Sequence, residues 1–495
     1  MIAKVSSVAL AGMDARPVDV EVDIGSGLPD FHIVGLPSAE VREARQRVRA
    51  AIQHSNEAWP QRKITVNLAP GDLRKEGALL DLALAVGVLT ASGRMAQDCV
   101  RRYLFMGELA LDGSLRPVRG ALAAALAARD NGLAGVVLPR QNADEAALVE
   151  GIQVLGARHL VEALALASGE LEPEKIDSRA EVLLDTALTL CPDMSEVRGQ
   201  ALARRALEIA AAGGHNLLLI GPPGSGKTML ARRLPGILPP LTLDEAVEVT
   251  HIWSVAGLLR PGTPVIASRP FRAPHHHASA SAVIGGGSPV PRPGEVSLAH
   301  KGTLFLDEIP LFSRAVLEAL RQPLEDSEVT IARRNSTIRF PADVCLIGAA
   351  NPCPCGGLGE GTVCICPPGR LESYRSRLSG PLIDRFDLFA EVPRLTQEEL
   401  FDLRPSQPSA EVRSRVIAAQ SFRRERTEGD DRSTILSNRS ASDFLRGALA
   451  KEPASARGFG KILSVARTIA DLEGVETVDE DHVAEAFNFR RTGWG

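Results

Sequence analysis

A glycine-rich loop, GPPGSGKT, carries the clearest chemical signal in this sequence. It fits the pattern G-x-x-x-x-G-K-[ST] in full and follows an apolar run, residues 217–220, that predicts a buried strand. Glycines let such a loop turn tightly, so that its N–H groups converge on phosphate oxygens. Lys227 would place a positive charge on the β- and γ-phosphates, and the Thr228 hydroxyl would ligate Mg²⁺. The predicted nucleotide-binding residues are Gly221, Pro222, Pro223, Gly224, Ser225, Gly226, Lys227 and Thr228.

Two further apolar runs end in polar side chains that suit hydrolysis. The first, residues 302–306, ends in Asp307 and Glu308. Asp307 would hold Mg²⁺ through its water shell, and Glu308 would polarise the attacking water. The second run, residues 344–350, ends at Asn351, whose amide would orient the same water beside the γ-phosphate. These residues and the glycine-rich loop predict a site that binds ATP with Mg²⁺ and hydrolyses it.

Four of the seven cysteines are clustered on one short loop as two C-x-C pairs: Cys353, Cys355, Cys364 and Cys366. Four thiolates favour a tetrahedral structural Zn²⁺ site, although C-x-C is tighter than the usual C-x₂-C, and free thiols are the alternative. The three consecutive histidines at 275–277 do not predict a metal site, because adjacent side chains on a loop rarely converge on one ion.

A basic turn lies between the Asp-Glu run and the Asn run. Residues 328–331 and 337–340 alternate in polarity and flank Arg333, Arg334 and Asn335, which predicts a β-hairpin over residues 328–340. The arginines at its tip are candidates for contact with a phosphate backbone. A solvated surface turn is the alternative.

The composition of the 495 residues is that of a globular protein, with 24% charged and 44% hydrophobic residues. A net charge of −5 excludes a uniformly basic nucleic-acid coat but leaves room for a local basic channel. No uncharged apolar run approaches the roughly 20 residues of a membrane span. The N-terminal region passes into an alternating strand at residues 18–24, which is not the pattern of a signal peptide. We therefore expect a cytoplasmic protein.

The chain divides into three predicted domains of an overall α/β class. Residues 1–170 form an α/β domain with mixed strands, and residues 171–193 form a charged, Pro-interrupted linker. A phosphate-loop core follows over residues 194–400, with the hairpin 328–340 and the cysteine insertion 353–366. Residues 401–495 are expected to form a helical lid, whose last helix begins at a capping box over residues 477–480.

The first domain resembles the protease domain of Lon and the end of RadA. The resemblance rests on residues 107–109 (GEL), 115–118 (LRPV) and 136–139 (VVLP). Lon-type catalysis needs a serine nucleophile and a lysine base within hydrogen-bond reach. This chain has EGALL at 76–80 in place of the serine motif and ALA at 121–123 in place of the lysine. We therefore expect a non-catalytic scaffold or interaction domain, similar in fold to domain 2 of ribosomal protein S5.

Over nearly its whole length the chain resembles the ComM/YifB family of magnesium-chelatase-like AAA+ ATPases. The residues that carry the resemblance are FRAPHHHASASAVIGGGSPVPRPGEVSLAHKGTLFLDE at 271–308, AANPCPCG at 349–356 and YRSRLSGPLIDRFDL at 374–388. The family's His-His-Thr/Ser is His-His-His here. The resemblance implies a hexameric ring that migrates branched DNA and helps to integrate incoming strands during natural transformation.

The resemblance also implies roles for several residues. Arg385 would be the arginine finger presented to the neighbouring subunit's ATP, with Arg375 and Arg377 as alternatives. Arg457, at the start of a lid helix, would be sensor 2 and touch the γ-phosphate. The hairpin would be the pre-sensor insertion, which points Arg333 and Arg334 at DNA in the pore of the ring. Residues 197–200 would help to wall the adenine. Surface ion pairs are the alternative for each arginine.

Two other functions remain open for such a motor. A magnesium-chelatase subunit would drive metal insertion into porphyrins, but the Lon-like front and the four cysteines count against it. A protein-remodelling ATPase would usually carry an aromatic pore loop, whereas the hairpin tip here is Arg-Arg-Asn.

Overall fold

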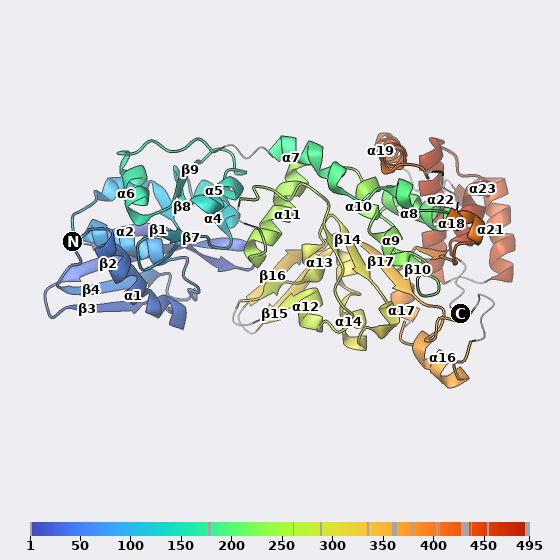
Figure 1. Cartoon of the computed structure of the whole chain (residues 1–495), viewed down its shortest axis with the longest axis horizontal. Coiled ribbons are helices and arrows are strands. Elements are labelled where there is room, and N and C mark those ends of the chain that lie inside the picture. The colour runs from blue at the N-terminus through green and yellow to red at the C-terminus, as the bar shows by residue number, and fades with distance from the viewer. Residues whose placement is uncertain are drawn as a thin grey trace.

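The computed structural model describes residues 2–176, 180–260, 262–287, 290–333, 336–358, 364–378, 380–401, 404, 406–426, 435–436, 438–452 and 455–490. Figure 1 shows an elongated chain, with the N-terminal domain at one end, the phosphate-loop core in the middle and the helical lid at the other end. The α/β class predicted from the sequence is confirmed. No helix within the described ranges is both long and apolar enough to cross a membrane.

The N-terminal domain is built on one mixed sheet of seven strands. In spatial order these are β3 (Asp30–Val34), β4 (Lys63–Ala69), β2 (Asp14–Gly25), β1 (Ile2–Ala11), β5 (Tyr103–Phe105), β8 (Gly135–Pro139) and β9 (Gln153–Ala157). The pairs β1–β2 and β2–β4 are antiparallel and the others are parallel. The remaining elements are α1 (Ala39–His54), α2 (Asp81–Ala91), α3 (Gln97–Arg101), β6 (Glu108–Leu109), β7 (Leu115–Arg116), α4 (Ala121–Asp130), α5 (Arg140–Ala146) and α6 (Leu160–Ser168).

The core holds a parallel sheet of five strands. Their spatial order is β11 (Phe271–Arg272), β14 (Thr303–Leu306), β17 (Cys345–Ala350), β10 (Leu217–Ile220) and β18 (Leu388–Glu391). The three apolar runs of the sequence become the three inner strands, with every residue of each buried. Their carboxyl ends therefore meet at one edge, where ligands bind in sheets of this kind.

Helices, turns and a two-stranded ribbon surround the core sheet. They are α8 (Ala201–Gly213), α9 (Lys227–Ala231), α10 (Leu234–Ile237), α11 (Leu243–Ala256), α12 (Ala280–Ile284), β12 (Gly285–Gly286), β13 (Arg292–Pro293), α13 (Glu295–Leu298), α14 (Arg314–Ala319), α15 (Pro323–Asp326), α16 (Pro368–Arg375), α17 (Gly380–Ile383) and α18 (Gln397–Phe401). Short 3₁₀ turns occupy Leu188–Leu190, Met194–Glu196 and Ile309–Leu311. The stretch expected to be a linker also contains a helix, α7 (Ala180–Ala187), whose Ala180 packs against Leu241 and Ala246 of the core.

The expected hairpin is present as β15 (Glu328–Arg333) and β16 (Ser336–Pro341), paired antiparallel. Its stem packs closely against the β1–β2 turn of the N-terminal domain. A Cβ on Gly12 in that turn would lie only 2.3 Å from Ile338 Cγ2, so the contact has room for glycine alone. Of the two arginines predicted to contact DNA, Arg334 lies outside the described residues, and the side chain of Arg333 is not described either.

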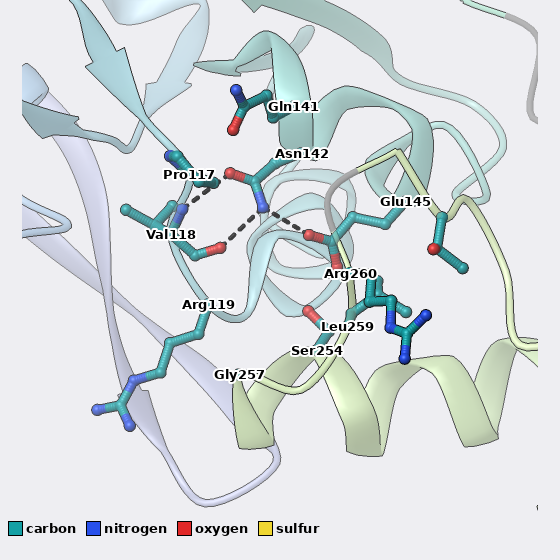
Figure 2. A pocket seen from close by; sticks show the side chains of 11 residues that line it. Pro117, Val118, Arg119, Gln141, Asn142, Glu145, Ser254, Gly257, Leu259 and Arg260 are labelled. Atoms are coloured by element: carbon teal, nitrogen blue, oxygen red, sulfur yellow. Dashed lines mark hydrogen bonds between the residues drawn. The ribbon is translucent and has the colours of Figure 1, made fainter.

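The N-terminal domain is joined to the core along helix α11. The Gly120 N–H donates to the Ser254 carbonyl at 3.1 Å, and a ring nitrogen of His251 lies 2.8 Å from the Met13 carbonyl oxygen. A cavity of about 260 Å³ opens at this seam, lined by residues of both domains (Figure 2). The two domains therefore share a polar boundary as well as a covalent linker.

One side chain organises the N-terminal wall of that cavity. Asn142 accepts from the Val118 N–H at 2.9 Å and donates to the Val118 carbonyl at 2.8 Å and to the Glu145 carboxylate at 2.7 Å, as Figure 2 shows. Glu145 is 4% exposed, and burial raises the pKa of its carboxyl. Asn142 thus fixes the loop that carries Gly120 onto α11.

The lid consists of α19 (Ser409–Glu425), α21 (Arg439–Lys451), α22 (Ala456–Glu473) and α23 (Glu480–Asn488). The capping box predicted at residues 477–480 is wrong by two residues. Asp479 is the N-cap of α23 and exchanges side-chain and backbone hydrogen bonds with His482. Val478 is buried in the lid core, and this holds the chain before Asp479 outside the helix.

Candidate active site

The glycine-rich loop follows the central strand β10 and leads into α9. Gly224 and Gly226 have φ of +79° and +98°, left-handed values that favour glycine. A Cβ on Gly221 would lie 2.1 Å from the Val392 carbonyl oxygen, so a third glycine is required for close backbone approach. Gln200, in the segment expected to wall the adenine, donates to the carbonyls of Ser225 and Pro393 and so lies beside the loop.

The Lys227 ammonium lies inside the loop, in a buried position. It donates to the carbonyls of Gly221 at 2.6 Å and Pro222 at 2.8 Å, and to Asn351 Oδ1 at 3.1 Å. The lysine and the strand-tip asparagine, 124 positions apart, therefore meet at the same point.

Thr228 and Asp307 also meet at this edge. The Thr228 hydroxyl donates to Asp307 Oδ2 at 2.8 Å. A hydroxyl and a carboxylate are the hard oxygen ligands that Mg²⁺ prefers. Thr228 lies at the start of α9, next to the lysine, and Asp307 directly follows β14. The donor set therefore fits the Mg²⁺ ion that the sequence predicts.

Glu308 stands next to these groups in a constrained backbone conformation. Its φ is +49°, an uncommon left-handed value for a residue other than glycine, and its N–H donates to Asp307 Oδ1 at 3.0 Å. Nδ1 of His276 lies 3.8 Å from Glu308 Oε2. Partial burial lowers the pKa of His276, and its histidine neighbours lower it further, which favours the neutral ring.

The three histidines are closer together than the sequence argument assumes. Their ligand nitrogens all lie within 4.8 Å of one another. The rings of His275 and His276 are close, with centroids 4.2 Å apart and planes inclined by 31°. The expectation that these adjacent side chains do not converge is therefore wrong, but we assign no metal to these residues.

Neither predicted arginine has a described contact with the phosphate loop of its own chain. Arg385 and Arg457 both bind Glu325 on α15, at 2.6 and 3.0 Å. Arg385 is only 6% exposed. Of the alternatives, Arg377 is exposed and donates to the Pro310 carbonyl at 3.3 Å. Sequence reasoning missed Glu325, since no local pattern marks a carboxylate at the end of a four-residue helix.

The four cysteines come together beside the phosphate loop. The Sγ atoms of Cys353, Cys355 and Cys364 lie 3.4 to 3.7 Å apart, and all four lie within 4.8 Å of one another. A tetrahedral site with Zn–S bonds of about 2.3 Å needs S–S separations of about 3.8 Å, so this donor set fits zinc. The Gly357 N–H and neighbouring thiols lower the pKa of Cys355 to about 6, whereas burial and neighbouring thiols raise the pKa of Cys364 to about 12, so Cys355 is the thiol that ionises first.

The cysteine loop also touches the nucleotide site. A Cβ on Gly356 would lie 2.4 Å from Pro223 Cδ, so the loop and the phosphate loop are in close contact. Tyr374 donates to the Asn351 carbonyl at 3.2 Å. Tyr374 of α16 therefore holds the backbone of Asn351, two residues before the cysteine loop begins.

Comparison with known proteins places the chain among relatives of matching length. The descriptions "Magnesium chelatase, subunit ChlI", "Subunit ChlI of Mg-chelatase" and "Magnesium chelatase, subunit ChlI C-terminal" match residues 193–400, 20–142 and 406–490. An uncharacterized protein of Mycobacterium tuberculosis is 44% identical over 98% of both chains. Competence protein ComM of Haemophilus influenzae is 42% identical over 99% of this chain and 97% of its own. The uncharacterized protein YifB of Escherichia coli is 42% identical over 97% and 96%. The chain therefore belongs to the ComM/YifB family of magnesium-chelatase-like AAA+ ATPases.

Proposed function

We propose that this chain is the subunit of a cytoplasmic, hexameric, ATP-driven ring motor that migrates branched DNA during natural transformation. One observation carries the proposal. Lys227, Thr228, Asp307 and Asn351 are joined by hydrogen bonds at the carboxyl ends of three adjacent strands, with Glu308 beside them. The name of the Haemophilus relative, a competence protein, supports the choice of DNA as substrate.

In the proposed reaction each side chain has one task. Lys227 binds the β- and γ-phosphate oxygens, and Thr228 and Asp307 hold Mg²⁺, which supplies charge neutralisation on the phosphates when bound. Glu308 accepts a proton from the attacking water, and Asn351 orients that water. Arg385 and Arg457 reach the ATP of a neighbouring subunit. Their shared pairing with Glu325 supports this, since neither has a described contact with the phosphate loop of its own chain.

The hairpin is the proposed contact with DNA. Arg333 and Arg334 at its tip would bind the phosphate backbone in the pore, and such contacts are independent of base sequence. The hairpin follows α15 directly, so its stem is joined to the element that holds both arginines of the hydrolysis site.

Replacing Arg333 and Arg334 together with Ala should weaken binding to every DNA sequence alike. The slope of log affinity against log salt should fall by about 1 for each phosphate that the variant no longer binds. Migration of junctions should fail while ATP hydrolysis without DNA continues, because no nucleotide ligand has changed. The measurement is salt-titrated binding to forked DNA beside the ATPase rate. Arg339→Ala, on the stem of the same hairpin and paired with Glu328, is the control.

Unchanged affinity, salt slope and migration in that double variant would assign the arginines to a solvated turn. The proposal of DNA as substrate has its own test, which is whether purified protein with ATP moves a three- or four-way DNA junction. Movement of junctions would support a DNA motor over the two alternatives, which are a magnesium-chelatase-type motor acting on a porphyrin and a protein-remodelling ATPase.

We further propose that Cys353, Cys355, Cys364 and Cys366 hold one structural Zn²⁺ per chain. Elemental analysis of protein purified without chelators should find about one zinc per chain. Cys353→Ser should lose it, whereas Cys99→Ser, which alters a half-buried cysteine of the N-terminal domain, should retain it. Wild-type protein with no bound metal would overturn this assignment.

A further inference from the structure

We infer that Glu325 is a positioning residue that couples the DNA hairpin to the ATP of the neighbouring subunit. In the resting chain it holds Arg385 and Arg457 together, and movement of the hairpin releases both. This inference rests on the proposed function, because the released arginines act on a neighbour's ATP.

A single oxygen atom makes both contacts. Glu325 Oε1 accepts from Arg385 Nη2 at 2.6 Å and from Arg457 Nη2 at 3.0 Å. Among the described residues, neither guanidinium therefore has the two-pronged pairing with a carboxylate that makes such contacts strong. The buried Nε of Arg385 has no hydrogen-bond partner among the described residues. Arg385 thus keeps a free donor for another acceptor.

Glu325 is tied mechanically to the hairpin. It lies in α15, and β15 begins three residues later, at Glu328. Ser327, between them, has a left-handed φ of +53°, and its carbonyl accepts from the Ala342 N–H at 2.8 Å, which closes the base of the hairpin. A displacement of the hairpin therefore displaces Glu325 without a flexible segment to absorb it.

The two arginines come from different parts of the chain. Arg385 precedes strand β18 of the core, whereas Arg457 opens helix α22 of the lid. The shared carboxylate of Glu325 thus joins hairpin, core and lid at one point. Withdrawal of Glu325 would free the core arginine and the lid arginine at the same time.

Further ion pairs lie near Arg385. Lys461 pairs with Asp387 at 2.7 Å, and Arg490 lies 3.7 Å from Asp384, so each of these carboxylates already has a cation. Glu325 is shared by two cations, and its side chain is 47% exposed. The pair with Arg457 is exposed on both sides and therefore weak, whereas Arg385 is buried, and a triphosphate is a stronger acceptor than one carboxylate. ATP of a neighbouring subunit would therefore displace Glu325.

The test compares Glu325→Gln with Glu318→Gln. Glu318 lies on the adjacent helix α14, its side chain is 49% exposed, and it pairs with the exposed Arg314, so it matches Glu325 in exposure and also carries an arginine partner. Without the negative charge of Glu325, ATP turnover in the absence of DNA should rise about fivefold. This factor is at the lower end of the range by which one site usually changes another. The ratio of turnover with forked DNA to turnover without it should fall towards one. Glu318→Gln should keep the wild-type values.

A second measurement does not depend on ATP hydrolysis. Amide hydrogen exchange without nucleotide should rise at the start of α22 in Glu325→Gln and stay unchanged in Glu318→Gln. Identical exchange in the two variants would overturn the inference. Inactive wild-type protein would instead remove the proposed function, and the exchange comparison could still be made. Turnover that falls by the same factor with and without DNA, together with a lower melting temperature, would reduce Glu325 to a structural role and also overturn the inference.

Discussion

Lys227→Ala should abolish ATP binding, whereas Glu308→Gln should bind ATP and scarcely hydrolyse it. The Lys227 ammonium is buried inside the phosphate loop, where its hydrogen bonds to Gly221, Pro222 and Asn351 place it for the β- and γ-phosphates. Each charge-assisted hydrogen bond contributes about 1.5–3 kcal/mol. Loss of two such hydrogen bonds, those from Lys227 to the β- and γ-phosphates, should therefore weaken ATP binding by at least about a hundredfold.

Glu308 acts at a different step. Its carboxylate lies outside the loop and is suited to accept the proton of the attacking water, a contribution of about 10²–10⁴ in rate. Glu308→Gln has nearly the same shape but is a far weaker base, so binding should survive while turnover falls by that factor.

The measurements are equilibrium binding of a fluorescent ATP analogue and steady-state phosphate release. Lys451→Ala, at an exposed position at the end of the lid helix α21, and Glu318→Gln are the matched controls and should behave as wild type. Wild-type turnover in both Lys227→Ala and Glu308→Gln would remove this site assignment.

Arg385→Ala should reduce turnover by about 10³–10⁵, the effect expected of an arginine finger, while ATP binding persists. The residue is buried against Glu325 in the single chain and has no described contact with its own phosphate loop. If it serves a neighbour, Arg385→Ala and Lys227→Ala subunits should complement each other. In an equal mixture, about a quarter of the interfaces would join an intact phosphate loop to an intact arginine.

Recovery of turnover on mixing two inactive variants is the decisive measurement. An arginine that acts within its own chain would give no recovery. The same mixture made with Arg377→Ala tests the exposed alternative, and recovery with that variant instead of Arg385→Ala would move the arginine finger to position 377.

Much of the fold was predictable because its signals are local. The loop at 221–228 and the three apolar runs are recognisable since a phosphate loop needs glycine and lysine at fixed spacing, and a buried strand needs consecutive apolar residues. Carboxyl ends of adjacent parallel strands must meet, so the convergence of Asp307 and Asn351 also followed.

Other elements lacked a local signal. Strand β11 has two residues, too few to show a period, and helix α7 lies in a stretch whose charges and proline suggested a linker. At the start of α23, Thr477 and Asp479 both suit an N-cap. Burial of Val478 favours Asp479, and that burial depends on how the lid helices pack.

The contacts that link one functional element to another came from the folded chain. Glu325 and Arg457 are 132 positions apart, and Gly356 meets Pro223 across a similar separation. Sequence spacing sets the chemistry of a loop or strand end, because those residues are neighbours in the chain. Which carboxylate two distant arginines share depends on how hairpin, core and lid pack together, and no spacing along the chain encodes that.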